Sequence, residues 1–207
     1  MIKAILYDLD GVLVDTTEWH YDALNDALME VAGFTIERNE HLNIFNGLPT
    51  KKKLEILESQ DKIKKSMFEK IWNIKQEKTL EVIKQSAQLD ETKRRLHSNT
   101  KNFKKICVTN SIKETAILML EKTGQLEFMD KVISNEDVSN PKPDPEGYLQ
   151  AIKFLKLESQ ECMIIEDNEK GIIAANKSGA FVYEVLGYQE VTLENILSQI
   201  NYFNKRT

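Results

Sequence analysis

The chain has 207 residues, of which 41% are apolar and 29% are charged, and its formal net charge is −5 at pH 7. This length and composition predict a globular protein with one core domain and room for a smaller insertion. The first apolar run contains Lys3 and stops at Asp8, so it is too short for a signal peptide or a membrane span, and we expect a cytoplasmic protein with no membrane partner. Cys107 and Cys162 each adjoin an apolar run, which is typical of buried free thiols.

The first predicted strand, residues 2–7, leads directly into Asp8 and Asp10 in the sequence YDLDGV. Residues two apart on a strand point the same way, so these carboxylates would repel one another unless a cation or a shared proton lies between them. An Asp-x-Asp pair is a weak signal by itself, since many turns contain one. The pair nevertheless favours a cation near the end of this strand.

Residues 15–88 have helical patterns throughout. A first apolar stripe ends before Gly33, Pro49 and Thr50 open a second helix, and a third stripe runs through residues 63–74. We therefore expect a core of residues 1–14 and 89–207, with residues 15–88 as an inserted helical cap over the end of the first strand.

The middle of the chain is basic. Residues 51–105 hold 16 Lys and Arg against 8 Asp and Glu, whereas the remainder holds 12 against 25. Because the lysines alternate with glutamates at helical spacing and few aromatic residues accompany them, a solvated helix surface is favoured and no nucleic-acid partner is expected. A basic cap would help to attract an anionic substrate toward an acidic site.

Four further apolar runs follow, at residues 106–108, 131–133, 163–165 and 181–185, with helical patterns at 112–123, 147–157 and 171–178 between them. This alternation predicts an α/β fold with a Rossmann-like, doubly wound parallel sheet. Ligands of such sheets bind beyond the carboxyl ends of the strands, so polar motifs at those ends are candidates for the functional site.

Three polar motifs lie at such positions. Thr109-Asn110-Ser111 follows the second strand before a helix, where an anion is favoured, although Asn110 or Ser111 could also be a simple helix N-cap. Lys142 stands between two prolines, and Glu166-Asp167 is a second acidic pair at a strand end. Two acidic pairs on strands that can be neighbours predict a site for a hard cation.

The ordered motifs DLDGV, VTNS, PKPDPEGY and IIEDNEKG resemble the four motifs of the haloacid dehalogenase superfamily. The resemblance is to the branch with a helical cap, which contains phosphoglycolate phosphatases and beta-phosphoglucomutase-like enzymes, and it covers the whole chain. It implies a Mg²⁺-dependent phosphatase that hydrolyses a small phosphorylated metabolite through an aspartyl-phosphate intermediate. A sugar, glycolate, polyol or amino-alcohol phosphate would suit, and we expect a monomer or a weak homodimer.

The resemblance also implies roles for individual residues. Asp8 matches the nucleophile, and Asp10 matches the general acid that later serves as the base for water. Thr109 and Asn110 match phosphate-binding positions, and Lys142 matches the cation that stabilises the phosphoryl oxygens.

The resemblance places the metal on Asp8, the Asp10 carbonyl and Asp167, with Glu166 orienting metal-bound water. His20 and Lys75 resemble cap positions that touch the substrate or assist proton transfer. His20 also lies on an apolar helical stripe, so a satisfied buried histidine is an equal interpretation.

Two alternatives remain open. A beta-phosphoglucomutase-like phosphomutase would need an arginine for the distal phosphate where Thr50 stands, and Lys51 to Lys53 could replace it only if their helix were turned. A non-catalytic phosphate-binding or assembly protein is the other, but such a protein should have lost at least one of the chemical groups. The chain also departs from the family pattern at Asn168, where a serine is common, and in lacking the usual Pro-Gly near the return from cap to core.

Overall fold

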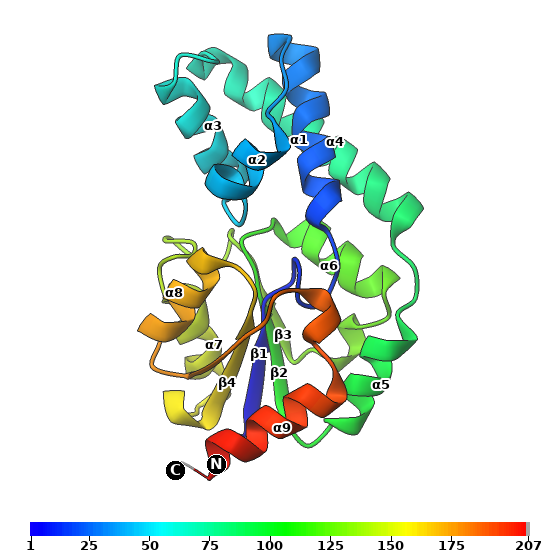
Figure 1. Cartoon of the computed structure of the whole chain (residues 1–207), viewed down its shortest axis with the longest axis vertical. Coiled ribbons are helices and arrows are strands. Elements are labelled where there is room, and N and C mark those ends of the chain that lie inside the picture. The colour runs from blue at the N-terminus through cyan, green and yellow to red at the C-terminus, as the bar shows by residue number, and fades with distance from the viewer. Residues whose placement is uncertain (206–207) are drawn as a thin grey trace. The chain divides into compact units, whose positions relative to one another are not determined.

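The structure is a computed structural model in which residues 1–205 are described. The chain divides into two compact units, one made of residues 1–15 and 88–207 and the other of residues 16–87. The first is an α/β core and the second is all helical (Figure 1). The sequence placed the limits of the helical insertion at residues 15 and 88.

The core unit is built on a five-stranded sheet of order β3-β2-β1-β4-β5 in which every neighbouring pair is parallel. Its strands are β1 (Ala4–Tyr7), β2 (Lys104–Val108), β3 (Lys131–Ile133), β4 (Cys162–Glu166) and β5 (Phe181–Glu184). Central strands of a parallel sheet are covered on both faces, which is why β1 and β4 are short runs of buried residues without polar alternation. The predicted doubly wound α/β fold is confirmed.

Helices cover both faces of the sheet. They are α5 (Glu91–Asn99), α6 (Lys113–Lys122), α7 (Glu146–Leu155), α8 (Glu169–Lys177) and α9 (Leu193–Asn204), with 3₁₀ turns at Leu126–Phe128, Ser159–Glu161 and Tyr188–Glu190. Helices α7 and α8 share one apolar cluster with β1, β2 and β4. On the other face, Phe203 of α9 stacks on Phe181 of β5, and His97 of α5 meets the ring of Tyr7 edge-on.

The strand register sets the positions of the polar motifs. Tyr7 pairs with Cys107 of β2 on one side and with Ile165 of β4 on the other. The residues that follow these three positions therefore emerge at one edge of the sheet, the edge formed by the carboxyl ends of the strands. After β1 the chain makes a tight turn, in which the amides of Leu13 and Val14 both donate to the carbonyl of Leu9.

The helical unit consists of α1 (Thr17–Ala32), α2 (Arg38–Glu40), a π-helical turn η1 (His41–Phe45), α3 (Thr50–Ser59), a 3₁₀ turn η2 (Lys65–Met67) and α4 (Phe68–Ser86). Helix α1 packs along α4. The apolar cluster of the helical unit includes Leu24, Phe45, Leu57 and Ile71. Gly33 ends α1 with a left-handed φ of 75°, a conformation that glycine adopts without strain. The unit therefore has its own hydrophobic core.

Two expectations from composition can be compared with the fold. Cys107 and Cys162 are both buried and free, as predicted. Among residues 1–205, none of the helices combines the length and the apolar character needed to cross a membrane.

Candidate active site

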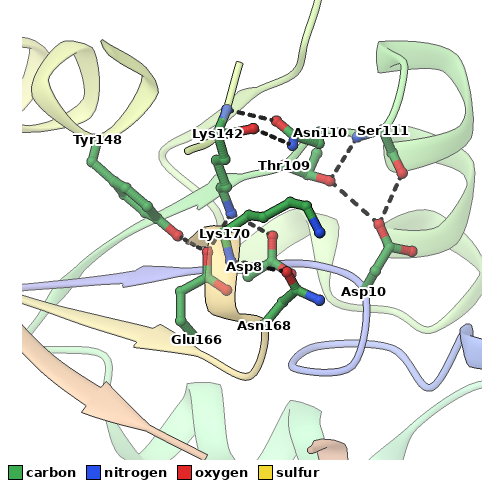
Figure 2. A network of polar contacts seen from close by, with 10 residues as sticks. All are labelled: Asp8, Asp10, Thr109, Asn110, Ser111, Lys142, Tyr148, Glu166, Asn168 and Lys170. Carbon is green, nitrogen blue, oxygen red and sulfur yellow. Dashed lines mark hydrogen bonds and ion pairs between the residues drawn. The ribbon is translucent and has the colours of Figure 1, made fainter. Parts of the chain in front are cut away.

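The polar motifs of the core unit meet at the carboxyl edge of the sheet (Figure 2). Asp8 follows β1, Thr109 follows β2 and Glu166 ends β4. Lys142 reaches the same place from the loop before α7. The topology thus brings together residues that are up to 158 positions apart, because the strands that carry them are parallel neighbours.

Lys142 is held at both ends. Its ammonium Nζ donates to Asp8 Oδ1 and to Glu166 Oε1, at 2.6 Å in each case. Its backbone N–H donates to Asn110 Oδ1 at 3.0 Å, and Asn110 Nδ2 donates back to its carbonyl at 3.1 Å. Burial alone would lower the pKa of Lys142, but the Asp8 and Glu166 carboxylates outweigh it and raise that pKa, so the lysine remains a cation.

The Asp10 carboxylate is held by two hydroxyl groups. Its Oδ2 accepts from Ser111 Oγ at 2.8 Å and from Thr109 Oγ1 at 3.4 Å, and Thr109 Oγ1 accepts from the amide of Ser111 at 3.0 Å. The N-cap interpretation of this motif is wrong, because α6 begins at Lys113 after Ile112, without a side-chain cap. Asn110 and Ser111 instead bind Lys142 and Asp10.

A compact acidic group lies beside these contacts. Carboxylate oxygens of Asp8, Glu166 and Asp167 lie within 4.8 Å of one another. Burial is the largest influence on Asp8, followed by the Glu166 carboxylate, and together they raise the pKa of Asp8 well above its ordinary value. Burial, Glu166 and Asp10 raise the pKa of Asp167 to about 7. The ionised forms of Asp8 and Asp167 are therefore disfavoured unless more positive charge is supplied.

The donor set fits a hard divalent cation such as magnesium. Two of its buried oxygens, Glu166 Oε2 and Asp167 Oδ1, have no hydrogen-bond partner within the described part of the chain. Buried polar atoms normally have partners, and carboxylate oxygens are the ligands that hard cations prefer. A bound cation would satisfy these oxygens and offset the mutual repulsion of the carboxylates.

Two glycines allow this crowding. A side chain at Gly11, where φ is +84°, would place its Cβ 2.0 Å from Asp167 Oδ2. At Gly171, in the first turn of α8, it would lie 2.1 Å from both carboxylate oxygens of Glu166. Any larger residue would have to displace an acidic group of the site, so the absence of a side chain at both positions has a steric reason.

Sequence reasoning gave no role to Tyr148, which the structure places in the site. Its hydroxyl donates to Glu166 Oε1 at 2.5 Å, and its ring centroid lies 4.9 Å from Lys142 Nζ. A fully buried tyrosine needs a partner for its hydroxyl, and Tyr148 lies in the same PKPDPEGY motif as the lysine. The presence of a tyrosine in the same motif as Lys142 was the signal from which its place in the site could have been predicted.

The other two predicted site residues lie in the helical unit. Lys75 Nζ is 3.3 Å from His20 Nδ1, so the packing of α1 against α4 brings these two side chains together. His20 is half-buried and Lys75 is buried. The pair is therefore a contact inside the helical unit.

The fold is a Rossmann-like α/β core with a network of polar residues at the carboxyl edge of its sheet. The chain belongs to the haloacid dehalogenase-like hydrolase family, whose sequence pattern matches residues 5–185. The predicted membership of this superfamily is confirmed.

Several relatives have printed functions. A phosphorylated carbohydrates phosphatase of Thermotoga maritima is 27% identical over 181 residues, which cover 86% of this chain and 82% of the relative. Pyrophosphatase PpaX of Bacillus velezensis is 27% identical over 186 residues, covering 86% of this chain and 80% of the relative. The chain is accordingly a phosphatase of phosphorylated substrates.

The solved structures include a beta-phosphoglucomutase of Clostridium difficile that superposes with a TM-score of 0.83. It is 25% identical, and the match covers 98% of this chain and 99% of that one. The overall likeness of the two chains therefore extends through the core and the helical insertion.

Proposed function

We propose that this protein is a magnesium-dependent phosphatase that hydrolyses a small phosphorylated metabolite through a phosphoryl intermediate on Asp8. The observation that supports the proposal is that the two aspartates have different neighbours. Asp8 contacts the Lys142 ammonium at 2.6 Å, whereas Asp10 contacts the Ser111 hydroxyl at 2.8 Å. The Lys142 ammonium favours the ionised form of Asp8 and opposes part of the burial and repulsion that raise the pKa of this carboxyl group, whereas the hydroxyl groups beside Asp10 can form hydrogen bonds with either of its protonation states.

In the first step, an Asp8 carboxylate oxygen attacks phosphorus and the bond from phosphorus to the ester oxygen breaks. Asp10 gives its proton to the departing oxygen, so the product leaves as a neutral alcohol. Lys142 stabilises the negative charge on the phosphoryl oxygens, together with Thr109 and Asn110 at the end of β2.

In the second step, water attacks the phosphoryl group on Asp8. Asp10, now ionised, takes a proton from this water, and the bond from phosphorus to Asp8 breaks. Inorganic phosphate leaves and both aspartates return to their starting states. The Thr109 and Ser111 hydroxyls hold the Asp10 carboxylate through both proton transfers.

Asp8, Asp167 and the carbonyl of Asp10 would hold the magnesium ion, and Glu166 would orient its water. When bound, the ion supplies positive charge that offsets repulsion between the phosphoryl group and the Asp8 carboxylate. Glu166 is suited to its role because Lys142 and Tyr148 occupy Oε1, which leaves Oε2 for a water molecule.

We further propose that residues 15–88 act as a cap that limits access of bulk water during the reaction and contributes specificity. His20 and Lys75 would contact the substrate from this unit. Their contact at 3.3 Å supports a joint role, because it holds the two side chains side by side.

The test is inorganic phosphate release from a panel of sugar, glycolate, polyol and amino-alcohol phosphates. Each compound is measured with Mg²⁺ and with excess chelator, and Asp8→Asn serves as the control. Release that requires Mg²⁺ and disappears in the variant supports the proposal. Equal release in chelator, or near-normal release by Asp8→Asn, contradicts it.

A phosphomutase is the second candidate, because the superposed Clostridium difficile protein is a beta-phosphoglucomutase. The same chemistry at Asp8 would then return the phosphoryl group to another sugar hydroxyl instead of to water. Isomerisation of a hexose phosphate in the presence of a bisphosphate primer, with negligible phosphate release, would favour this candidate.

A further inference from the structure

The turn that follows β1 carries Asp10 and is closed by its own backbone. The amides of Leu13 and Val14 donate to the carbonyl of Leu9 at 2.9 and 3.0 Å, and the amide of Gly11 donates to the carbonyl of Val14 at 2.8 Å. These bonds lie on both sides of Asp10, so the position of its carboxylate depends on where the turn as a whole is held. Leu13 also presents a carbonyl oxygen that none of these bonds uses.

The side chain of Gln125 binds that carbonyl oxygen. Gln125 follows α6 and is fully buried. Its Nε2 donates to the Leu13 carbonyl at 2.9 Å, across 112 positions of sequence, and to Thr123 Oγ1 at 2.9 Å. Its Oε1 lies 3.1 Å from His97 Nε2. One buried amide therefore connects α5, the end of α6 and the turn that carries Asp10.

The partners of this amide determine its orientation. A carbonyl oxygen only accepts hydrogen bonds, so the group that faces Leu13 is the NH₂ and the atom that faces His97 is the oxygen. His97 Nε2 therefore carries a proton and donates it to Gln125. Burial is the largest influence on His97 and lowers its pKa to about 4, so the ring is neutral at physiological pH. Both hydrogens and the oxygen of the amide thus have partners, as a buried amide requires.

Two sets of contacts hold Asp10, and they flank one helix. The Thr109 and Ser111 hydroxyls, which precede α6, bind its carboxylate (Figure 2). Gln125, which follows α6, binds the backbone of its turn. A group that transfers a proton must lie within hydrogen-bond reach of the reacting oxygen, and a displacement of about 1 Å can lower a rate by about 10²-fold. Both sets of contacts therefore bear on proton transfer.

We propose that Gln125 is a positioning residue for Asp10. By binding the Leu13 carbonyl, it holds the turn where the Asp10 carboxyl group can give its proton to the departing oxygen and later take one from water. Gln125 is buried and acts through Asp10 without contacting the substrate. This inference rests on the proposed phosphatase function, and it adds a residue from outside the four motifs to the groups that control proton transfer.

The experiment compares phenyl phosphate with p-nitrophenyl phosphate. Phenol needs a proton to leave, whereas p-nitrophenol leaves readily as its anion, so only the first ester depends strongly on the Asp10 acid. Gln125→Met keeps the size of the side chain and removes its polar groups. We expect kcat/KM for phenyl phosphate to fall at least about tenfold more than kcat/KM for p-nitrophenyl phosphate, which is part of the roughly 10²- to 10⁴-fold that a positioned acid contributes.

Two controls separate positioning from stability. Thr123→Val removes the hydroxyl that also binds the amide but leaves the bond to Leu13, so it should lower the thermal stability without changing the ratio of the two kcat/KM values. In the Asp10→Asn background, Gln125→Met should not change that ratio further, because the acid through which it acts is already absent. If Gln125→Met does not fold by circular dichroism, Gln125→Asn, whose amide is one methylene shorter, provides the same comparison.

Three results would overturn this inference and leave the phosphatase proposal intact. The first is an unchanged ratio of the two kcat/KM values in Gln125→Met, and the second is an equal change of the ratio in Thr123→Val. The third is a further change of the ratio in the Asp10→Asn background, since Gln125 would then act by another route. Failure of the wild-type protein to release phosphate from either ester or from the metabolite panel would instead contradict the proposed function itself.

Discussion

The two units of the chain differ in how their buried charges are arranged. At the carboxyl edge of the sheet, the Lys142 ammonium lies between the Asp8 and Glu166 carboxylates, and hydroxyl groups hold Asp10. In the helical unit, the charged groups that shift the pKa of His41 are all basic, and together with burial they lower that pKa to about 3. The candidate site of the core unit thus pairs charges of opposite sign, whereas charges of one sign act on a neutral ring in the helical unit. Burial is therefore compatible with a cation in one unit and keeps a ring neutral in the other.

The largest effect should come from removing the nucleophile. Asp8→Asn should lower phosphate release by at least about 10⁴-fold, because no other group forms the intermediate. The fold should survive, since the change also relieves repulsion among the site's carboxylates. Trapping of a labelled phosphoenzyme checks that the variant forms no intermediate.

Asp10→Asn is the informative control for that experiment. It should still form some phosphoenzyme from substrates with good leaving groups, because such groups need little protonation, but it should hydrolyse the intermediate slowly. Equal loss of phosphoenzyme in both variants would contradict the separate roles of the two aspartates.

Lys142→Met should lower kcat by about 10²- to 10³-fold, the usual cost of removing one group that stabilises charge in the transition state. It also leaves Asp8 and Glu166 without their shared cation, so the free energy of unfolding should fall. Steady-state kinetics and thermal unfolding measure the two effects. A variant with wild-type stability would argue against the bridging contact.

Tyr148→Phe should have a smaller effect, about tenfold in kcat, because it removes one hydrogen bond to a carboxylate. Glu166 would then turn more freely, and the Mg²⁺ concentration for half-saturation should rise, as measured by calorimetric titration. Tyr183→Phe is the control, since the Tyr183 hydroxyl bonds to the Glu190 carbonyl away from the site. Unchanged Mg²⁺ affinity in Tyr148→Phe would limit the tyrosine to packing.

The smallest effect concerns acid stability in the helical unit. Folded His41 stays neutral down to about pH 3, whereas the unfolded residue takes up a proton near pH 6.5. The unfolded state binds more protons in that window, so stability is lost as the pH falls through it. His41→Gln should reduce this loss by the contribution of up to one proton, seen in denaturant unfolding at a series of pH values. Parallel curves for the two proteins would contradict the depressed pKa.

Much of the candidate active site could be predicted because its position depends on topology. Alternating strands and helices determine a parallel sheet, and the carboxyl ends of its strands meet, so acidic pairs such as Asp8-Asp10 and Glu166-Asp167 had to lie at one edge. The motif resemblance then assigned their roles. The sequence pattern could not predict the individual contacts, because Asn110 and Ser111 are residue types that are equally typical of a helix N-cap.

The burial of Lys53 and Lys75 in the helical unit could not be predicted in the same way. The sequence favoured a solvated surface for the lysines of residues 51–105, and Lys53 differs from the exposed Lys51 only in the helix face that it occupies. Tyr148 was overlooked for a related reason, since a tyrosine in a helix is usually part of an apolar core, and only the position of Glu166 gives its hydroxyl a partner.

The double hydrogen bond between the Asn110 side chain and the Lys142 backbone has a consequence for mutagenesis. Asn110 uses one donor and one acceptor to fix the loop that carries the lysine, so the two positions form one functional unit across 32 residues of sequence. Substitutions of residues in a shared hydrogen-bond network have non-additive effects. The effects of Asn110→Ala and Lys142→Met on kcat should therefore be non-additive. Once one of the two residues has been replaced, replacing the other should cost little further activity.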